Sequence, residues 1–235
     1  MINYAHRGAS EYAPENTLSS FYLGLLHGAN GIETDVQMTK DGVLVLFHDD
    51  AVNRISNGVG KISDFTFEQL SKLEIRGNST SGFYDRVVTF REFLEKFSSY
   101  PIKFAIELKA YGCEEEVLRL AKEFGILEKI TFTSFKYEYI RKIKELCQSA
   151  RIGWLVYEGT DEEVQKLLEI GGEEIAPKAE YISEKSIEAW RAAGLGVRAW
   201  GVSNVGLMKK MCDLRVDGMT VNFPDRLYQY LNSKK

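Results

Sequence analysis

The chain has 235 residues, of which 44% are hydrophobic and 27% charged, a composition typical of a folded globular protein and not of a disordered one. Thirty basic and 34 acidic residues give a formal net charge of −4, so no basic excess points to nucleic acid as a partner. The three cysteines, Cys113, Cys147 and Cys212, form no CxxC pair. Their odd number and wide spacing argue against a disulfide framework or a zinc–thiolate site, and favour a reducing compartment.

The first residues, MINYAHRGAS, contain no basic stretch followed by an apolar one, so they predict no secretory signal. No apolar run approaches the roughly 18–20 residues that cross a bilayer. Together with the cysteine usage, these features lead us to expect a cytoplasmic protein without a transmembrane segment.

Short runs rich in apolar and β-branched residues alternate with segments of helical periodicity along most of the chain. The runs that predict strands are 2–5, 31–36, 104–108, 130–134, 152–156, 174–176, 197–201 and 218–222. The segments that predict helices are 16–28, 65–73, 89–97, 114–124, 137–147, 162–170, 183–193, 203–212 and 224–231. This alternation is typical of parallel strands joined by crossover helices.

Eight such units in a chain of this length predict an α/β fold, the TIM (β/α)8 barrel. An open doubly wound sheet is the alternative, but HRGASEYAPEN after the first strand does not match the GxGxxG dinucleotide fingerprint. No Pro/Ser-rich linker interrupts the chain, so we expect a single barrel domain over residues 1–235. The regular alternation is broken only by an insertion after the second strand, at roughly residues 37–88, whose loop segments SNGVG and GNSTSG could shape a lid.

The insertion begins with a predicted β-hairpin. The runs GIETDVQMTK and VLVLFHDD flank Asp41-Gly42, a dipeptide preferred in two-residue type I′ turns. Such a turn pairs Lys40 with Val43 and therefore places Asp35 opposite His48 and Glu33 opposite Asp50. Side chains alternate along a strand, so this register predicts that all four acidic and imidazole groups share one face.

In an α/β barrel, polar residues at the carboxyl ends of strands are the candidates for catalysis. Glu33 and Asp35 at the end of the second predicted strand, and Glu107 at the end of the third, form a set of three carboxylates. Carboxylate oxygens select a hard cation such as Mg²⁺ or Ca²⁺. An ion-pair network with Arg7 and Lys109 explains the same residues equally well.

His6 and His48 are two of only three histidines and lie at predicted strand ends. Two imidazoles near a cation suit phosphoryl chemistry, one as general base and one as general acid. Arg7 can bind a phosphate through its guanidinium fork, although an ion pair with Glu33 or Glu15 is the simpler role. Trp200 can form the wall of a polyol pocket or belong to the barrel core.

Several long motifs together resemble the glycerophosphodiester phosphodiesterase family, and they cover nearly the whole chain in the family's order. They are HRGASEYAPENT, GIETDVQMTKDGVLVLFHD, NRISNGVGKISDFTFEQL, the Glu-Leu-Lys of IELK, RAWGVSN and VDGMTVNFPD. The resemblance is to the compact bacterial cytoplasmic branch. It implies a TIM barrel with a β-hairpin-containing insertion after the second strand.

The resemblance also implies a role for each candidate residue. It implies catalytic histidines at His6 and His48, one divalent cation (Mg²⁺ or Ca²⁺) on Glu33, Asp35 and Glu107, a phosphate-binding Arg7, an active-site Lys109, and a glycerol-lining Trp200. The chain departs from the family pattern at Ile55, Gly201 and Val221-Asn222, where many members have Thr, Thr and Thr-Asp. These departures bear on substrate preference.

The reaction implied is hydrolysis of small-molecule glycerophosphodiesters to sn-glycerol 3-phosphate and an alcohol, through a cyclic phosphate formed by the glycerol 2-hydroxyl. A phosphatidylinositol-type phospholipase C is a rival activity, disfavoured by the intact PENT and TKDG segments. The same residues are also compatible with a lysophospholipase D activity, or with a barrel that binds phosphodiesters or polyols without turnover. The sequence leaves four points open: the leaving alcohol, the physiological metal, which histidine is the acid and which the base, and the oligomeric state.

Overall fold

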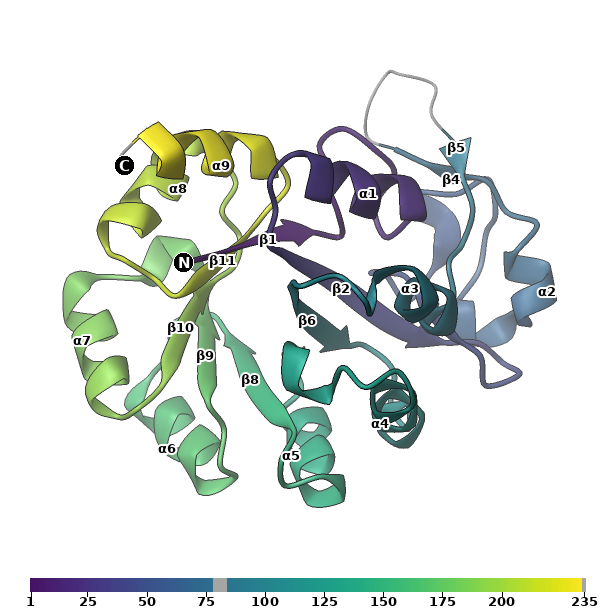
Figure 1. Cartoon of the computed structure of the whole chain (residues 1–235). Helices are drawn as coiled ribbons and strands as arrows, with labels where there is room; N and C mark the ends of the chain where they lie inside the picture. Colours follow the sequence, from purple (N-terminus) through teal and green to yellow (C-terminus); the bar gives the residue numbers. More distant parts are fainter. Residues whose placement is uncertain (78–83, 234–235) are drawn as a thin grey trace.

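Eight parallel strands close into a barrel in the computed structural model, which describes residues 1–77 and 84–233. The first strand, β1 (Ile2–His6), pairs with both β2 (Gly31–Met38) and β11 (Gly218–Val221), and this double pairing closes the sheet (Figure 1). The strands between them are β6 (Lys103–Leu108), β7 (Ile130–Ser134), β8 (Arg151–Val156), β9 (Glu174–Pro177) and β10 (Gly196–Ala199). The predicted TIM barrel is confirmed.

Helices surround the barrel on the outside (Figure 1). They are α1 (Leu18–Leu26), α3 (Phe90–Phe97), α4 (Glu114–Glu123), α5 (Tyr137–Leu146), α6 (Asp161–Glu169), α7 (Glu184–Ala192), α8 (Val205–Asp213) and α9 (Pro224–Ser233), with single 3-10 turns η3 (Leu127–Lys129) and η4 (Ala179–Tyr181). Each buries one apolar face against the strands, as α3 does with Phe90, Phe93 and Phe97. Among the described residues, every helix is too short or too polar to cross a membrane.

The insertion after β2 forms a lobe beside the barrel, at the right of Figure 1. It consists of β3 (Leu44–Leu46), η1 (Val52–Arg54), η2 (Ile62–Asp64), α2 (Phe67–Leu70), β4 (Ile75–Arg76) and β5 (Tyr84–Asp85). A small core of its own, built around Val45, Phe47 and Leu70, is separate from the barrel core. The predicted hairpin-containing insertion is confirmed, while residues 78–82 of the GNSTSG loop lie outside the described residues.

The predicted register of the hairpin was wrong by one residue. Strand β2 pairs with β3 through Val36 and Leu46, and the backbone N–H of Phe47 donates to the Asp35 carbonyl at 3.0 Å, so Asp35 lies opposite Phe47 and not His48. Likewise, Asp50 does not face Glu33, because it accepts a hydrogen bond from Gln37 at 3.2 Å.

The cause of the shift is a three-residue loop in place of the expected two-residue turn. The Thr39 hydroxyl donates to Asp41 at 2.6 Å and accepts from the Val43 backbone N–H at 2.9 Å. Gly42 takes the left-handed conformation, with φ of 79°, that three-residue hairpin loops require at this position. The side-chain bonds of Thr39 and Asp41 therefore stabilise the longer loop.

Candidate active site

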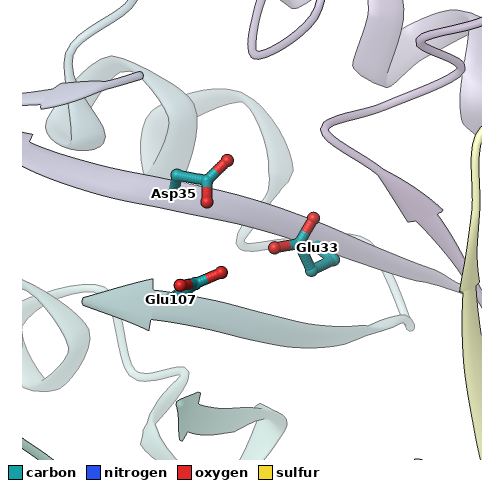
Figure 2. Close-up of side chains that lie close together, drawn as sticks. All are labelled: Glu33, Asp35 and Glu107. Atoms are coloured by element: carbon teal, nitrogen blue, oxygen red, sulfur yellow. The ribbon is translucent and has the colours of Figure 1, made fainter. Parts of the chain in front are cut away.

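Three carboxylates gather where β2 and β6 run side by side. Asp35 pairs directly with Glu107 across the two strands, and Glu33 lies two residues before Asp35 on the same face. Strand β2 continues to Met38, beyond the end of the predicted strand, so Glu33 and Asp35 lie within it and not at its end. One oxygen from each carboxylate lies within 4.8 Å of the other two, and all three residues are buried (Figure 2).

Two cations only partly neutralise this cluster. The Lys109 Nζ lies 2.7 Å from Glu107 and 3.4 Å from Asp35, and the Arg7 Nε lies 3.3 Å from Asp35. Burial and the charges of the neighbouring carboxylates raise the pKa of Glu33 to about 8 and that of Glu107 to about 7. The ion-pair network considered from the sequence is therefore present, but it does not fully offset the repulsion between the ionised carboxylates.

Asp35 is the best-compensated member of the cluster. Although burial disfavours its charged form, Arg7 and Lys109 outweigh that effect and lower its pKa. Its Oδ1 is nevertheless buried without a hydrogen-bond partner among the described residues. An orphaned oxygen within a close set of oxygen donors fits a hard divalent cation.

An unexpected amide supports the carboxylates. The first helix was predicted to begin at Asn16, but Thr17 is the N-cap of α1 and Asn16 adopts a positive φ of 56°. The Asn16 side chain donates to Asp35 Oδ2 at 2.9 Å and accepts from the Thr34 hydroxyl at 2.7 Å. It therefore orients Asp35 within the cluster, a role that the sequence pattern did not indicate.

His6 ends β1 beside the carboxylates. Its Nδ1 lies 2.6 Å from Asn222 Oδ1, and its Nε2 lies 3.9 Å from Glu33. Because an amide oxygen only accepts, this contact places the ring proton on Nδ1 and leaves Nε2 as the free nitrogen. Burial and the charge of Arg7 lower the pKa of His6, which keeps the imidazole neutral in this setting.

His48 reaches the same site from the insertion, just after β3 ends. Its Nδ1 lies 2.6 Å from Asp49 Oδ1. Partial burial opposes ionisation of Asp49, but hydrogen bonds from Arg54 and His48 lower its pKa. An ionised carboxylate only accepts hydrogen bonds, so His48 also carries its proton on Nδ1 and has a free Nε2.

Arg54 links the His48 loop to the barrel. Its Nε donates to Asp49 at 2.6 Å, while Nη1 and Nη2 donate to the two oxygens of Glu15 at 2.8 and 2.7 Å. Glu15 is buried and also accepts from Arg7 Nη1 at 3.0 Å. The ion pair between Arg7 and Glu15 expected from the sequence is thus one part of a chain of charges that extends from Asp35 to His48.

These groups surround a cavity of about 200 Å³. Its lining includes six of the eight predicted site residues, His6, Arg7, Glu33, His48, Glu107 and Trp200, together with Phe135, Leu155, Arg198, Gly201 and Thr220. The Trp200 indole donates to the Val156 carbonyl at 2.8 Å and packs edge-on against Phe135, with ring centres 5.0 Å apart. Asp35 and Lys109 adjoin the cavity through their ion pairs with Arg7 and Glu107.

All eight predicted residues therefore come together, and the prediction missed their supporting residues. Asp49 and Arg54, which position His48, were not predicted, whereas Asn222, which contacts His6, was noted in the sequence as a departure from the family pattern. The acidic pair after His48 was a usable signal for Asp49, since histidines are commonly oriented by a carboxylate on the second ring nitrogen. Arg54 had no comparable signal, because its contacts depend on how the insertion folds back.

Comparison with known proteins identifies the family. A sequence model of the glycerophosphoryl diester phosphodiesterase family matches residues 6–226. A glycerophosphodiester phosphodiesterase of Caldanaerobacter subterraneus subsp. tengcongensis is 32% identical over 231 residues, which cover 95% of this chain and 94% of that protein. One from Bacillus altitudinis is 30% identical, with 95% of each chain covered.

Solved structures agree with these sequence matches. An Oleispira antarctica phosphodiesterase in complex with the product sn-glycerol-3-phosphate is 25% identical and superposes with a TM-score of 0.85, covering 97% of this chain and 96% of that one. The chain belongs to the glycerophosphoryl diester phosphodiesterase family. It is accordingly an enzyme, and its activity is that of a phosphodiesterase.

Proposed function

We propose that this enzyme hydrolyses glycerophosphodiesters to sn-glycerol 3-phosphate and an alcohol, and that residues 1–235 act as one catalytic domain. The observation that carries the proposal is the convergence of two histidines and three buried carboxylates on one cavity. Both histidines hold their Nδ1 proton in a hydrogen bond and have Nε2 free for proton transfer. The product named in the related Oleispira antarctica structure supports the choice of substrate.

Glu33, Asp35 and Glu107 would hold one Mg²⁺ or Ca²⁺, because they offer oxygen donors only and because a cation would offset the repulsion between their ionised forms that raises the pKa of Glu33 and of Glu107. When bound, such a cation supplies Lewis-acid stabilisation of charge on the phosphate oxygens. Arg7 and Lys109 bind the phosphate and offset the same charge. Trp200 and Phe135 cover the apolar face of the glycerol.

The reaction proceeds by internal attack. One of His6 and His48 removes the proton of the glycerol 2-hydroxyl, whose oxygen then attacks phosphorus. The bond from phosphorus to the alcohol breaks, and the other histidine protonates the departing oxygen. Water opens the resulting cyclic phosphate, with the two histidines exchanging their roles. The substrate hydroxyl serves as nucleophile because no Ser or Cys lines the cavity among the described residues.

The direct test is the release of sn-glycerol 3-phosphate and choline from glycerophosphocholine by the purified protein, with added Mg²⁺ or Ca²⁺. His6→Ala and His48→Ala should each lower kcat by at least about 100-fold, the usual contribution of a positioned general acid or base. Turnover that is absent in the unmodified enzyme, or unchanged in both variants, would refute the proposal.

We also propose that the enzyme works in the cytoplasm. The support is chemical: Cys113 and Cys147 form no disulfide in the described part of the chain, which suits a reducing compartment. Cell fractionation with an antibody against the protein tests this location, and recovery outside the cytoplasmic fraction would contradict it.

A further inference from the structure

A buried guanidinium forms part of the floor of the cavity. Arg198 lies in β10 two residues before Trp200, so both side chains point toward the barrel interior. Arg198 is only 1% exposed and yet lines the cavity together with His6, Glu33 and Thr220. Barrel interiors are filled mainly by branched apolar residues, so a cation at this depth calls for an explanation.

The contacts of Arg198 leave its buried Nη2 atom without an acceptor among the described residues. Its Nε donates to Glu174 on the neighbouring strand β9 at 2.7 Å, and its guanidinium carbon lies 5.6 Å from the centre of the Tyr4 ring. The Nη2 atom is buried and has no hydrogen-bond partner in the described part of the chain. Because guanidinium nitrogens only donate, this atom requires an oxygen acceptor.

The interior is shaped to hold the pair of Arg198 and Glu174. A Cβ atom at Gly153 would lie 2.9 Å from the Glu174 carboxylate, and one at Gly218 would lie 3.0 Å from the Tyr4 ring. Glycine at these two strand positions therefore makes room for the larger polar side chains. Well-packed apolar residues are often at least as stabilising as a buried ion pair, so stability alone does not account for this arrangement.

The geometry points to Arg198 as a further substrate-binding residue, whose guanidinium donates to the terminal hydroxyl of the glycerol phosphate, at the end of the glycerol away from the phosphate. This inference rests on the proposed function, in which Arg7 and Lys109 hold the phosphate. Those two residues follow the ends of β1 and β6, whereas Arg198 lies within β10 and therefore deeper in the barrel. The end of the glycerol that lies away from the phosphate would thus reach Arg198. A small cavity of about 200 Å³ suits a short polyol in this position.

The test compares two ligands that differ only in the terminal hydroxyl. They are sn-glycerol 3-phosphate and propane-1,2-diol 1-phosphate of matching configuration, which carries a methyl group in place of CH₂OH. Titration calorimetry with the purified protein and Mg²⁺ should show that the diol phosphate binds about 10- to 100-fold more weakly, the effect of losing a hydrogen bond from a charged donor.

Variants at the floor should abolish this preference. R198M/E174Q removes both charges of the pair, so no buried charge is left without its partner. The two ligands should bind this variant equally. R198K retains a cation opposite Glu174 but lacks Nη2, and it should lose the preference as well. It also keeps the test decisive if the double variant fails to fold in a thermal melt.

A matched control is the ion pair of Lys144 and Glu173, which are 2.8 Å apart and outside the cavity, with Lys144 buried and Glu173 partly buried. The variant K144M/E173Q should keep the full preference for sn-glycerol 3-phosphate. The inference would be overturned if the unmodified protein binds the two ligands equally or binds neither. It would also be overturned if the preference survives in either Arg198 variant that folds. Because the readout is binding, absence of turnover on glycerophosphocholine would reject the proposed function separately.

Discussion

Replacing Arg54 by methionine should disable the enzyme without unfolding it. Arg54 does not line the cavity, but it holds Asp49 through Nε and Nη2, and Asp49 in turn holds His48. Strand β3 ends at Leu46, so sheet pairing does not fix the position of His48. The ion pairs of Arg54 with Asp49 and Glu15 tie this loop to the barrel, together with hydrogen bonds from the Gln37 amide to the Asp49 carbonyl and to Asp50.

The expected loss of stability is small. Breaking a buried ion pair by removing one partner costs ~3–5 kcal/mol. Here Glu15 keeps Arg7 as a partner, and the Arg54 side chain is 41% exposed. Solvent screening therefore reduces the cost to ~1–2 kcal/mol. The expected loss of activity is larger, because misplacing a catalytic group by about 1 Å lowers the rate ~100-fold, or ~2.7 kcal/mol of barrier.

The measurements are kcat and KM for glycerophosphocholine and a thermal melt of R54M. We expect kcat to fall about 100-fold with little change in KM, since Arg54 touches no part of the cavity. The matched control is R119M, which removes an arginine that pairs with Glu116 and Glu123 on the exposed face of α4. If R54M and R119M have the same kcat, the chain of charges does not position His48 and this reasoning is wrong.

Three further predictions concern the metal and the substrate. Exhaustive removal of metal by chelation should abolish activity, and full activity after this treatment would contradict a cation on the carboxylates. Glu107→Gln should weaken Mg²⁺ binding, measured by calorimetry, by more than about tenfold with little change in melting temperature. Burial and neighbouring carboxylates raise the pKa of Glu33 to about 8 and of Glu107 to about 7, so the metal-free folded protein binds protons at these groups more tightly than the unfolded chain does. The free energy of unfolding of the metal-free protein should therefore fall as the pH rises from about 4.5 through 8. The increase in melting temperature produced by Mg²⁺ should accordingly be larger at about pH 8 than at about pH 5.5, and an equal increase would count against competition between protons and the cation. Finally, a 2-deoxy analogue of glycerophosphocholine should have a kcat/KM at least about a thousandfold lower, ~4 kcal/mol of the intramolecular advantage, whereas comparable values would mean that water attacks phosphorus directly.

The barrel could be predicted from the sequence because its strands are short, buried and separated by amphipathic helices. Periodicity reports which faces are buried, and that information is local. The hairpin register could not be predicted in the same way, because Asp41-Gly42 fits both a two-residue and a three-residue loop. The choice depends partly on a distant contact, in which the Lys40 backbone N–H donates to the Phe65 carbonyl at 2.8 Å.

Likewise, some residues of the candidate site could be predicted from the sequence and others could not. His6, Glu107 and Lys109 could be found because parallel strands bring their carboxyl ends to one rim of the barrel. Arg198 carried no such signal, since its importance depends on Glu174 and on an interior that glycines leave open. Whether a charged residue is paired, and by which atom, is decided by tertiary packing.

The hydrogen bond between His6 and Asn222 joins two residues that are 216 positions apart in the chain. During synthesis, β1 is made first of all the strands, and β11, which completes its pairing, is made last. Until β11 arrives, β1 has a free edge and His6 lacks its partner on Nδ1. Contacts of such long sequence separation slow folding, and unpaired strand edges favour aggregation in partly folded chains. Closure of the barrel and the contact of His6 with Asn222 therefore both wait for β11, and we expect a chain truncated before residue 218 to have an open sheet and no activity.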